Sequence, residues 1–157
     1  EEYMTQSLNP GAKAPGFSIE TTLGTKQLTS FRGKHLILYF YPKDDTPGCT
    51  NEAKDFSDLA EKFEAADAAI LGVSRDSLIR HQKFAQKHGL QIELGSDESG
   101  SVCEAYGVWV EKNLYGRTYM GIARSTFLID PKGILTRIWP KVRVKGHAQD
   151  VLDSLNV

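Results

Sequence analysis

The alternation of apolar and polar stretches along this chain predicts a series of buried strands. The longest apolar run, His35 to Tyr41, is typical of a strand in the middle of a sheet. Ala68 to Val73 predicts a second buried strand. Ser125–Ile129 and Ile134–Trp139 predict two more, joined by a turn at Asp130–Gly133. Since this late pair is joined by a short turn, we do not expect an all-parallel, doubly wound sheet.

Apolar residues at spacings of three and four predict the helices. Between Thr50 and Ala66 these positions are Ala53, Phe56, Ala60 and Phe63, which give one apolar face. Further helices are expected over residues 77–88, where Gly89 is a C-cap, over 99–106, and around Val151 near the end.

Weaker signals complete the order of elements. Phe17–Thr21 and Lys26–Leu28 predict two short strands, and Ile92–Gly95 predicts a third. Val110–Met120 is polar and aromatic, which indicates a long loop or a hairpin. Strands and helices in this order imply a mixed central β-sheet flanked by helices on both faces. We therefore expect an α/β protein with a thioredoxin-like fold.

Composition favours one globular domain over residues 1–157, with residues 1–10 as a flexible N-terminal segment. The net charge of −1 and the absence of any block of like charge argue against nucleic-acid or membrane partners. The polar N-terminus has no signal-peptide core, and two widely spaced cysteines fit a reducing compartment. These features indicate a cytoplasmic protein.

No spacing typical of metal ligands is visible, because the four histidines are scattered and neither cysteine has a close partner. We therefore expect no metal and no cofactor. Lys43-Asp44-Asp45 could form a metal or phosphate loop, but an exposed charged turn is the simpler interpretation. Trp109, Trp139 and the aromatic cluster around Tyr115 and Tyr119 are expected to pack rather than to bind a ligand.

The candidate catalytic residues lie in the segment Pro42–Cys49, which leads from the long apolar strand into a helix. Cys49 is expected in the first turn of that helix, where free N–H groups and the helix dipole favour a thiolate over a thiol. This is the setting of a reactive cysteine. Taken alone, it is equally compatible with a small buried thiol beside ordinary turn and capping residues.

The pattern Pro-x-x-x-Thr-x-x-Cys, formed by Pro42, Thr46 and Cys49, resembles the active-site motif of the peroxiredoxins. The wider string from Tyr39 to Thr50 is similar to the bacterioferritin-comigratory-protein subfamily, also called the peroxiredoxin Q type. The resemblance continues in Leu71–Asp76, Gly107–Trp109 and Arg124–Asp130, and it covers nearly the whole chain from about Gly11 to Leu155.

This resemblance implies a thiol-dependent peroxidase for hydrogen peroxide and organic hydroperoxides. Cys49 would attack the peroxide and become a sulfenic acid. The Thr46 hydroxyl would bind both thiolate and peroxide, and Pro42 would shield the thiolate from solvent. Family resemblance, rather than spacing, selects Arg124 as the cation beside the sulfur, with Glu52 orienting it.

The sequence departs from the subfamily at the resolving cysteine. The two positions where members carry it are Lys54 and Ala85 here, and only Cys103 remains. We expect Cys103 to be a buried core thiol rather than the resolving group. A one-cysteine cycle follows, recycled by thioredoxin, glutaredoxin or a small thiol such as glutathione. The resemblance also implies a monomer or small homodimer.

Three other classes remain open. A thiol–disulfide exchanger would need Cys-x-x-Cys, but Thr46 occupies the first position. A copper-chaperone relative would need Cys-x-x-x-Cys and a distal histidine. A peroxide sensor or holdase would use the same Cys49 chemistry and pass the oxidation to a partner protein.

Overall fold

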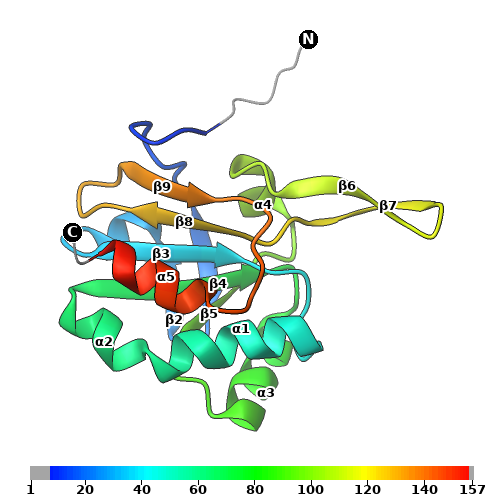
Figure 1. Ribbon diagram of the computed structural model, residues 1–157, viewed down its shortest axis with the longest axis horizontal. Helices are drawn as coiled ribbons and strands as arrows, with labels where there is room; N and C mark the ends of the chain where they lie inside the picture. The colour runs from blue at the N-terminus through cyan, green and yellow to red at the C-terminus, as the bar shows by residue number, and fades with distance from the viewer. Residues whose placement is uncertain (1–7, 156–157) are drawn as a thin grey trace.

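The computed structural model describes residues 8–155, and most of its strands join one seven-stranded mixed sheet (Figure 1). The strands lie in the order β2-β1-β5-β4-β3-β8-β9. Neighbours β3, β4 and β5 are parallel, whereas β1, β8 and β9 run antiparallel to their partners. The arrangement is a thioredoxin-like α/β fold, as predicted.

The described chain contains the following strands: β1 Ser18–Thr21, β2 Gly24–Gln27, β3 His35–Phe40, β4 Ala68–Ser74, β5 Glu93–Ser96, β6 Trp109–Leu114, β7 Arg117–Ile122, β8 Ser125–Ile129 and β9 Leu135–Trp139. The helices are α1 Pro47–Asp58, α2 Ala60–Ala65, α3 Leu78–His88, α4 Ser101–Ala105 and α5 His147–Ser154, with one 3-10 turn, η1 Leu28–Phe31.

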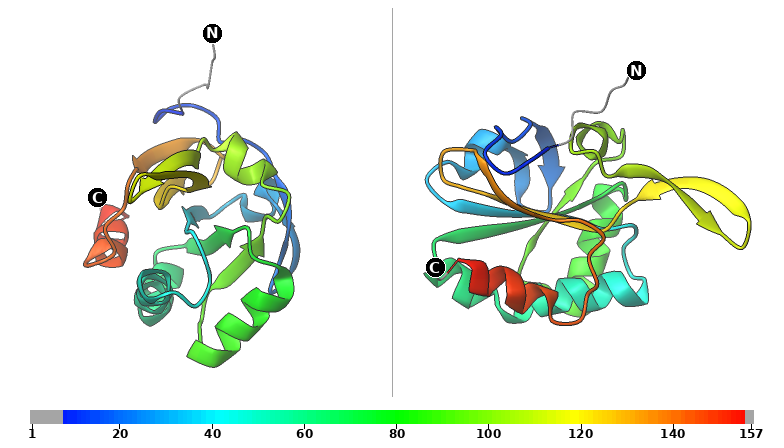
Figure 2. Two further views of the ribbon diagram at one scale, coloured as in Figure 1. Left: turned by 90° about the vertical axis from the view of Figure 1, so that its right-hand side faces the viewer. Right: turned by 45° about the horizontal axis from the view of Figure 1, so that its top comes forward.

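Side chains of β3 alternate between two hydrophobic clusters, one on each face of the sheet. Leu36, Leu38 and Phe40 face the side covered by η1 and α4. Ile37 and Tyr39 face the side covered by α1, α2, α3 and α5. Figures 1 and 2 show these four helices together on one side of the sheet. The prediction of helices on both faces is therefore confirmed, although the second face carries only short ones.

Two local predictions need correction. The helix expected over Thr50–Ala66 begins earlier, at Pro47, and is interrupted at Leu59, whose N–H bonds to Phe56. The helix expected over 99–106 is limited to Ser101–Ala105. In contrast, Gly89 does end α3 in the left-handed conformation, with φ of 59°, as the C-cap prediction requires.

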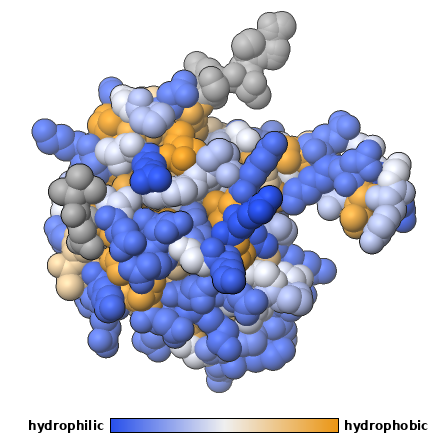
Figure 3. Space-filling view, viewed as in Figure 1, coloured by the Kyte–Doolittle hydropathy of each residue, from blue (hydrophilic) through white to orange (hydrophobic). Residues whose placement is uncertain are grey.

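Strands β6 and β7 form a separate two-stranded hairpin that stands out from the body of the molecule (Figures 2 and 3). Leu114, Tyr115, Tyr119 and Met120 on this hairpin are exposed, and Tyr115 has 96% of its surface accessible. The expectation that Tyr115 and Tyr119 pack into the protein is therefore wrong. Trp109, by contrast, packs against the core and lies under the Arg75 guanidinium.

Most of the predicted flexible segment over residues 1–10 lies outside the described residues. Of its last three residues, Leu8 packs against the core and the Asn9 carbonyl accepts a hydrogen bond from Ala12. Within residues 8–155, no helix is both long and apolar enough to cross a membrane.

Candidate active site

Cys49 lies in the first turn of α1, directly after the loop that leaves the end of β3. Thr46 is the N-cap and Pro47 is the first helical residue, a position that suits proline because no helical N–H is needed there. The first helical hydrogen bond runs from Thr50 N–H to Thr46 O, so the N–H groups of Gly48 and Cys49 precede the helical ladder. The thiol is 2% exposed and packs among Tyr39, Tyr41 and Phe56.

Arg124 places a fixed positive charge on this sulfur. Its Nη2 donates to Cys49 Sγ at 3.3 Å, and its Nη1 donates to Glu52 Oε1 at 2.6 Å. The side chain is 17% exposed. Burial alone would lower the pKa of Arg124, but Glu52 and Cys49 beside it raise the pKa above its ordinary value. The guanidinium therefore stays charged next to the thiol at any physiological pH.

Glu52 lies one turn after Cys49 and is 1% exposed. Burial raises the pKa of Glu52 to about 7, although the charge and hydrogen bond of Arg124 oppose the shift. Its second oxygen, Oε2, is buried and has no hydrogen-bond partner in the part of the chain that the structure describes. Glu52 thus holds the guanidinium through Nη1, which leaves Nη2 to contact the sulfur.

Thr46 and Pro42 belong to the segment that leads from β3 into α1. The Thr46 hydroxyl donates its single proton to the Lys43 carbonyl at 2.8 Å, so a hydrogen bond to the thiolate requires it to turn. Pro42 directly follows Tyr41 and is exposed. The structure brings the Arg124 side chain onto Cys49 and places Thr46 three residues before it. Among the described residues, Pro42 is not part of the hydrophobic cluster that contains Cys49.

Cys103 lies far from this chemistry in the fold, although both cysteines are free and buried. It belongs to the hydrophobic cluster under α4, on the opposite face of the sheet from the cluster that contains Cys49. Burial raises the pKa of the Cys103 thiol. A hydrogen bond with the Asp97 side chain and the negative charge of Asp97 raise it further. A thiol that is 0% exposed and disfavours its thiolate is a poor partner for a sulfenic acid.

A second cation near the site was not predicted from the sequence. Lys112 in β6 interacts electrostatically with Arg124 and with Cys49. Burial lowers the pKa of Lys112, Arg124 lowers it further, and Cys49 opposes the shift. Lys112, which pairs with Tyr119 in the hairpin, therefore contributes to the electrostatic surroundings of the thiol. Nothing in the spacing of residues 110–120 distinguishes this lysine from an exposed one.

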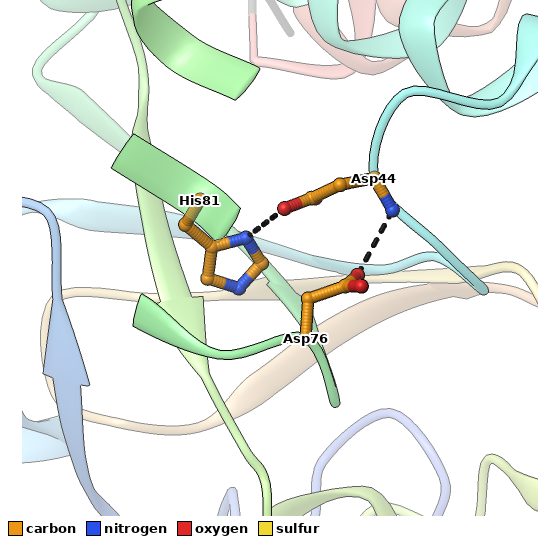
Figure 4. A group of neighbouring side chains, drawn as sticks. All are labelled: Asp44, Asp76 and His81. Atoms are coloured by element: carbon orange, nitrogen blue, oxygen red, sulfur yellow. Dashed lines mark hydrogen bonds and ion pairs between the residues drawn. The ribbon is translucent and has the colours of Figure 1, made fainter. Parts of the chain in front are cut away.

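The structure also corrects the interpretation of Lys43-Asp44-Asp45 as an exposed turn. Lys43 and Asp45 are exposed, but Asp44 is only 2% exposed and lies beside Asp76 and His81 (Figure 4). Potential ligand atoms of these three side chains lie within 4.8 Å of one another, so the chain does hold a cluster with the donor set of a metal site. Each of its side chains is already hydrogen-bonded within the protein, which makes it a polar network.

The fold and the site define a thioredoxin-like protein with a cysteine in the first turn of a helix. An arginine side chain contacts the sulfur of this cysteine. Residues 10–138 match the model of the AhpC/TSA family. A putative peroxiredoxin bcp of Coxiella burnetii is 49% identical over 150 residues, covering 95% of this chain and 99% of that protein. Peroxiredoxin Bcp of Bacillus subtilis is 49% identical, covering 92% of this chain and 93% of that protein.

Solved structures agree with these relatives. A PrxQ mutant of Xylella fastidiosa superposes with a TM-score of 0.91 at 38% identity, covering 97% of this chain and 98% of that one. The bacterioferritin comigratory protein of Xanthomonas campestris gives a TM-score of 0.85 at 45% identity, covering 89% and 90%. The chain therefore belongs to the AhpC/TSA family, within its peroxiredoxins of Bcp or PrxQ type. It is a thiol-dependent peroxidase.

Proposed function

We propose that Cys49 is the peroxidatic residue and that the protein reduces hydrogen peroxide and alkyl hydroperoxides. The observation that carries this proposal is the 3.3 Å contact between Arg124 Nη2 and Cys49 Sγ at the start of α1. Alkyl peroxide reduction is the stated activity of the Xanthomonas campestris relative, and its similarity to this chain supports the same substrate class here.

In the first step, the Cys49 thiolate attacks one oxygen of the peroxide and the O–O bond breaks. Sulfur is oxidised to a sulfenic acid, and the leaving oxygen takes the electron pair and a proton to become water or an alcohol. Negative charge moves from sulfur to the leaving oxygen during this step. Arg124 is placed to stabilise that charge, because its guanidinium is fixed by Glu52 before the peroxide arrives.

Thr46 and Pro42 would complete the pocket. In this proposal the Thr46 hydroxyl turns from the Lys43 carbonyl to donate to the reacting atoms and to accept from the peroxide O–H. Pro42 has no N–H to compete for these atoms, and it limits the approach of water. Glu52 acts through Arg124 and does not touch the substrate.

We further propose a one-cysteine cycle. Xanthomonas campestris Peroxiredoxin Q has been solved as two cysteine-to-serine mutants. The separation between its two substituted cysteines equals that between Cys49 and Ala85 in this chain. Ala85 has no sulfur, Lys54 is an exposed residue of α1, and Cys103 is buried on the other face of the sheet.

An external thiol would therefore resolve the sulfenic acid. Its sulfur attacks Cys49 Sγ, water leaves, and a mixed disulfide forms. A second thiol then releases Cys49 and leaves with the first as a disulfide. Thioredoxin, glutaredoxin or a small thiol such as glutathione would supply these electrons in a reducing, cytoplasmic compartment. Such a cycle needs no second subunit, which fits a monomer or a small homodimer.

Hydroperoxide loss followed over time, with thioredoxin, thioredoxin reductase and NADPH or with a glutaredoxin and glutathione system, tests the proposal. Many turnovers per protein are expected with at least one of these reductants, and none with Cys49→Ser, which is nearly isosteric. Wild-type turnover by Cys49→Ser would falsify the assignment of Cys49. One turnover only, with every reductant, would indicate a peroxide sensor.

A further inference from the structure

The loop between β3 and α1 is fixed to the rest of the protein through one buried acidic side chain, Asp44. From Pro42 to Thr46, Asp44 alone is buried, and it follows the buried Tyr41. The Tyr41 hydroxyl donates to Asp44 Oδ1 at 2.6 Å, and His81 Nδ1 lies 2.7 Å from Asp44 Oδ2. Figure 4 shows the His81 ring in α3 directed at this carboxyl group.

His81 is itself fixed at both ring nitrogens. Its Nε2 lies 2.8 Å from the carbonyl oxygen of Gly95 in β5, and the ring is 0% exposed. A carbonyl oxygen only accepts, so Nε2 carries a hydrogen. The 2.7 Å distance between Nδ1 and Asp44 Oδ2 is that of a hydrogen bond. If the Asp44 carboxyl group lost His81, one of its buried oxygens would have no hydrogen-bond partner, which would destabilise the folded state.

The backbone of the loop is held as well. Asp44 N–H donates to Asp76 Oδ2 at 2.9 Å, and the same oxygen accepts from the Ser74 hydroxyl. Asp45, with φ of 62°, pairs with Lys87 and His88 of α3. These last pairs are exposed and contribute little. The buried contact between Asp44 and His81 is therefore the main attachment of the loop to α3.

We propose that His81 is a positioning residue of the peroxidase site, acting through Asp44 on the loop that carries Pro42 and Thr46. This inference rests on the proposed role of Cys49. The loop sets where the Thr46 hydroxyl lies relative to the sulfur, and a displacement of about 1 Å at such a group can cost up to about a hundredfold in rate. Arg124, which directly precedes β8, approaches Cys49 independently of this attachment.

Two amide variants of His81 separate the proposal from a general effect on packing. In His81→Asn the amide nitrogen takes the place of Nδ1 and can still donate to Asp44. In His81→Gln the amide nitrogen takes the place of Nε2, so it keeps the Gly95 contact and loses Asp44. Gln82→Ala, at an exposed neighbouring position of α3, is the matched control.

The readouts are the second-order rate of Cys49 oxidation by hydrogen peroxide, measured by rapid quenching with dimedone, and the rate of alkylation by iodoacetamide. Peroxide oxidation should be slowed at least about tenfold in His81→Gln and by no more than about threefold in His81→Asn. Alkylation should change less than oxidation in both, because it requires the thiolate but not Thr46. Circular dichroism and thermal melting confirm that each variant is folded.

Equal oxidation rates in the two variants, whether normal or slow, would overturn the proposal, since the contact with Asp44 would then not matter. If His81→Gln does not fold, Asp44→Asn and Asp44→Ala test the same contact. Asn keeps hydrogen bonds to Tyr41 and His81, whereas Ala loses both, so only Ala should slow oxidation about tenfold or more. Peroxide consumption by Cys49→Ser would instead contradict the proposed function, independently of His81.

Discussion

Arg124 Nη2 lies 3.3 Å from Cys49 Sγ, although 75 residues separate the two along the chain. Strand pairing produces this proximity. Arg124 directly precedes β8, whose first residue, Ser125, pairs with Phe40 at the end of β3. The loop to Cys49 leaves the sheet from that same end. The cation and the sulfur are thus fixed by the register of two antiparallel neighbours in the core of the sheet.

Replacing Arg124 should therefore remove the positive charge beside the sulfur. Arg124→Ala is expected to slow Cys49 oxidation by about two orders of magnitude or more, as for the loss of an oxyanion donor. Arg124→Lys, which keeps the charge but cannot reach Glu52 and Cys49 together, should lie between Ala and wild type. Stopped-flow peroxide kinetics and iodoacetamide alkylation at pH 7 measure both effects. Wild-type rates in Arg124→Ala would mean that another cation, such as Lys112, serves the sulfur.

Gly48 is the residue that allows the guanidinium to come so close. A β-carbon at this position would lie 3.3 Å from Arg124 Nη2. Apart from its chain neighbours and the backbone of α1, no other group of the described residues would lie within 4 Å of it. Gly48→Ala should displace the guanidinium by a few tenths of an ångström and slow peroxide oxidation about threefold to tenfold. Gly16→Ala is the matched control, because its β-carbon would enter open space. Equal rates in the two variants would show that this spacing is unimportant.

Glu52 makes the stability of the fold depend on pH near neutrality. Burial raises its pKa from the ordinary value of 4.5 to about 7 in the folded protein. The folded state therefore binds this proton more tightly than the unfolded state does. The resulting stabilisation is fully present below about pH 4.5 and is lost as pH rises through about 7, by at most about 3 kcal/mol.

Urea unfolding of wild type and Glu52→Gln between pH 5 and pH 9 measures this contribution. Glutamine cannot ionise, so the difference in unfolding free energy between the two proteins should change in favour of the variant as pH rises. A difference that stays constant across this range would show that Glu52 remains ionised and paired with Arg124 throughout.

Much of the fold could be predicted from the sequence because its signals are local. The apolar run at His35–Tyr41 and the alternation after Ser125 identify core strands, and Gly89 ends α3 where a left-handed residue is needed. The hairpin was one of two alternatives expected over Val110–Met120, whereas the break at Leu59 and the protrusion of the hairpin from the body were not predicted. Tyr115 is aromatic, so burial was expected, yet it lies at a hairpin tip that nothing in the described residues covers.

The site was less accessible to sequence reasoning. The start of a helix can be recognised from neighbouring residues in the sequence, and for this reason Cys49 could be identified as a reactive candidate. Arg124 was selected by family resemblance. Its proximity to Cys49 results from the register of β3 and β8, which the spacing of residues along the chain does not reveal. Asp44 was assigned to an exposed turn for the same reason. Its partner Tyr41 is only three residues away, but His81 comes from α3, 37 residues further along the chain, and only the assembled fold shows that the carboxyl group is buried.

Cys103 provides the last test, because the one-cysteine cycle requires that it take no part. It lies in α4, within the cluster on the face of the sheet opposite Cys49, and both thiols are nearly inaccessible. A disulfide requires Cα atoms within about 7 Å, which the intervening sheet prevents without local unfolding. One equivalent of peroxide should therefore leave a dimedone-reactive sulfenic acid at Cys49, and Cys103→Ser should turn over like wild type.

With reductant absent, excess peroxide should carry Cys49 on to sulfinic acid. Intact mass decides the outcome: a loss of two hydrogens without a dimedone adduct would reveal a bond between Cys49 and Cys103 and end the one-cysteine proposal.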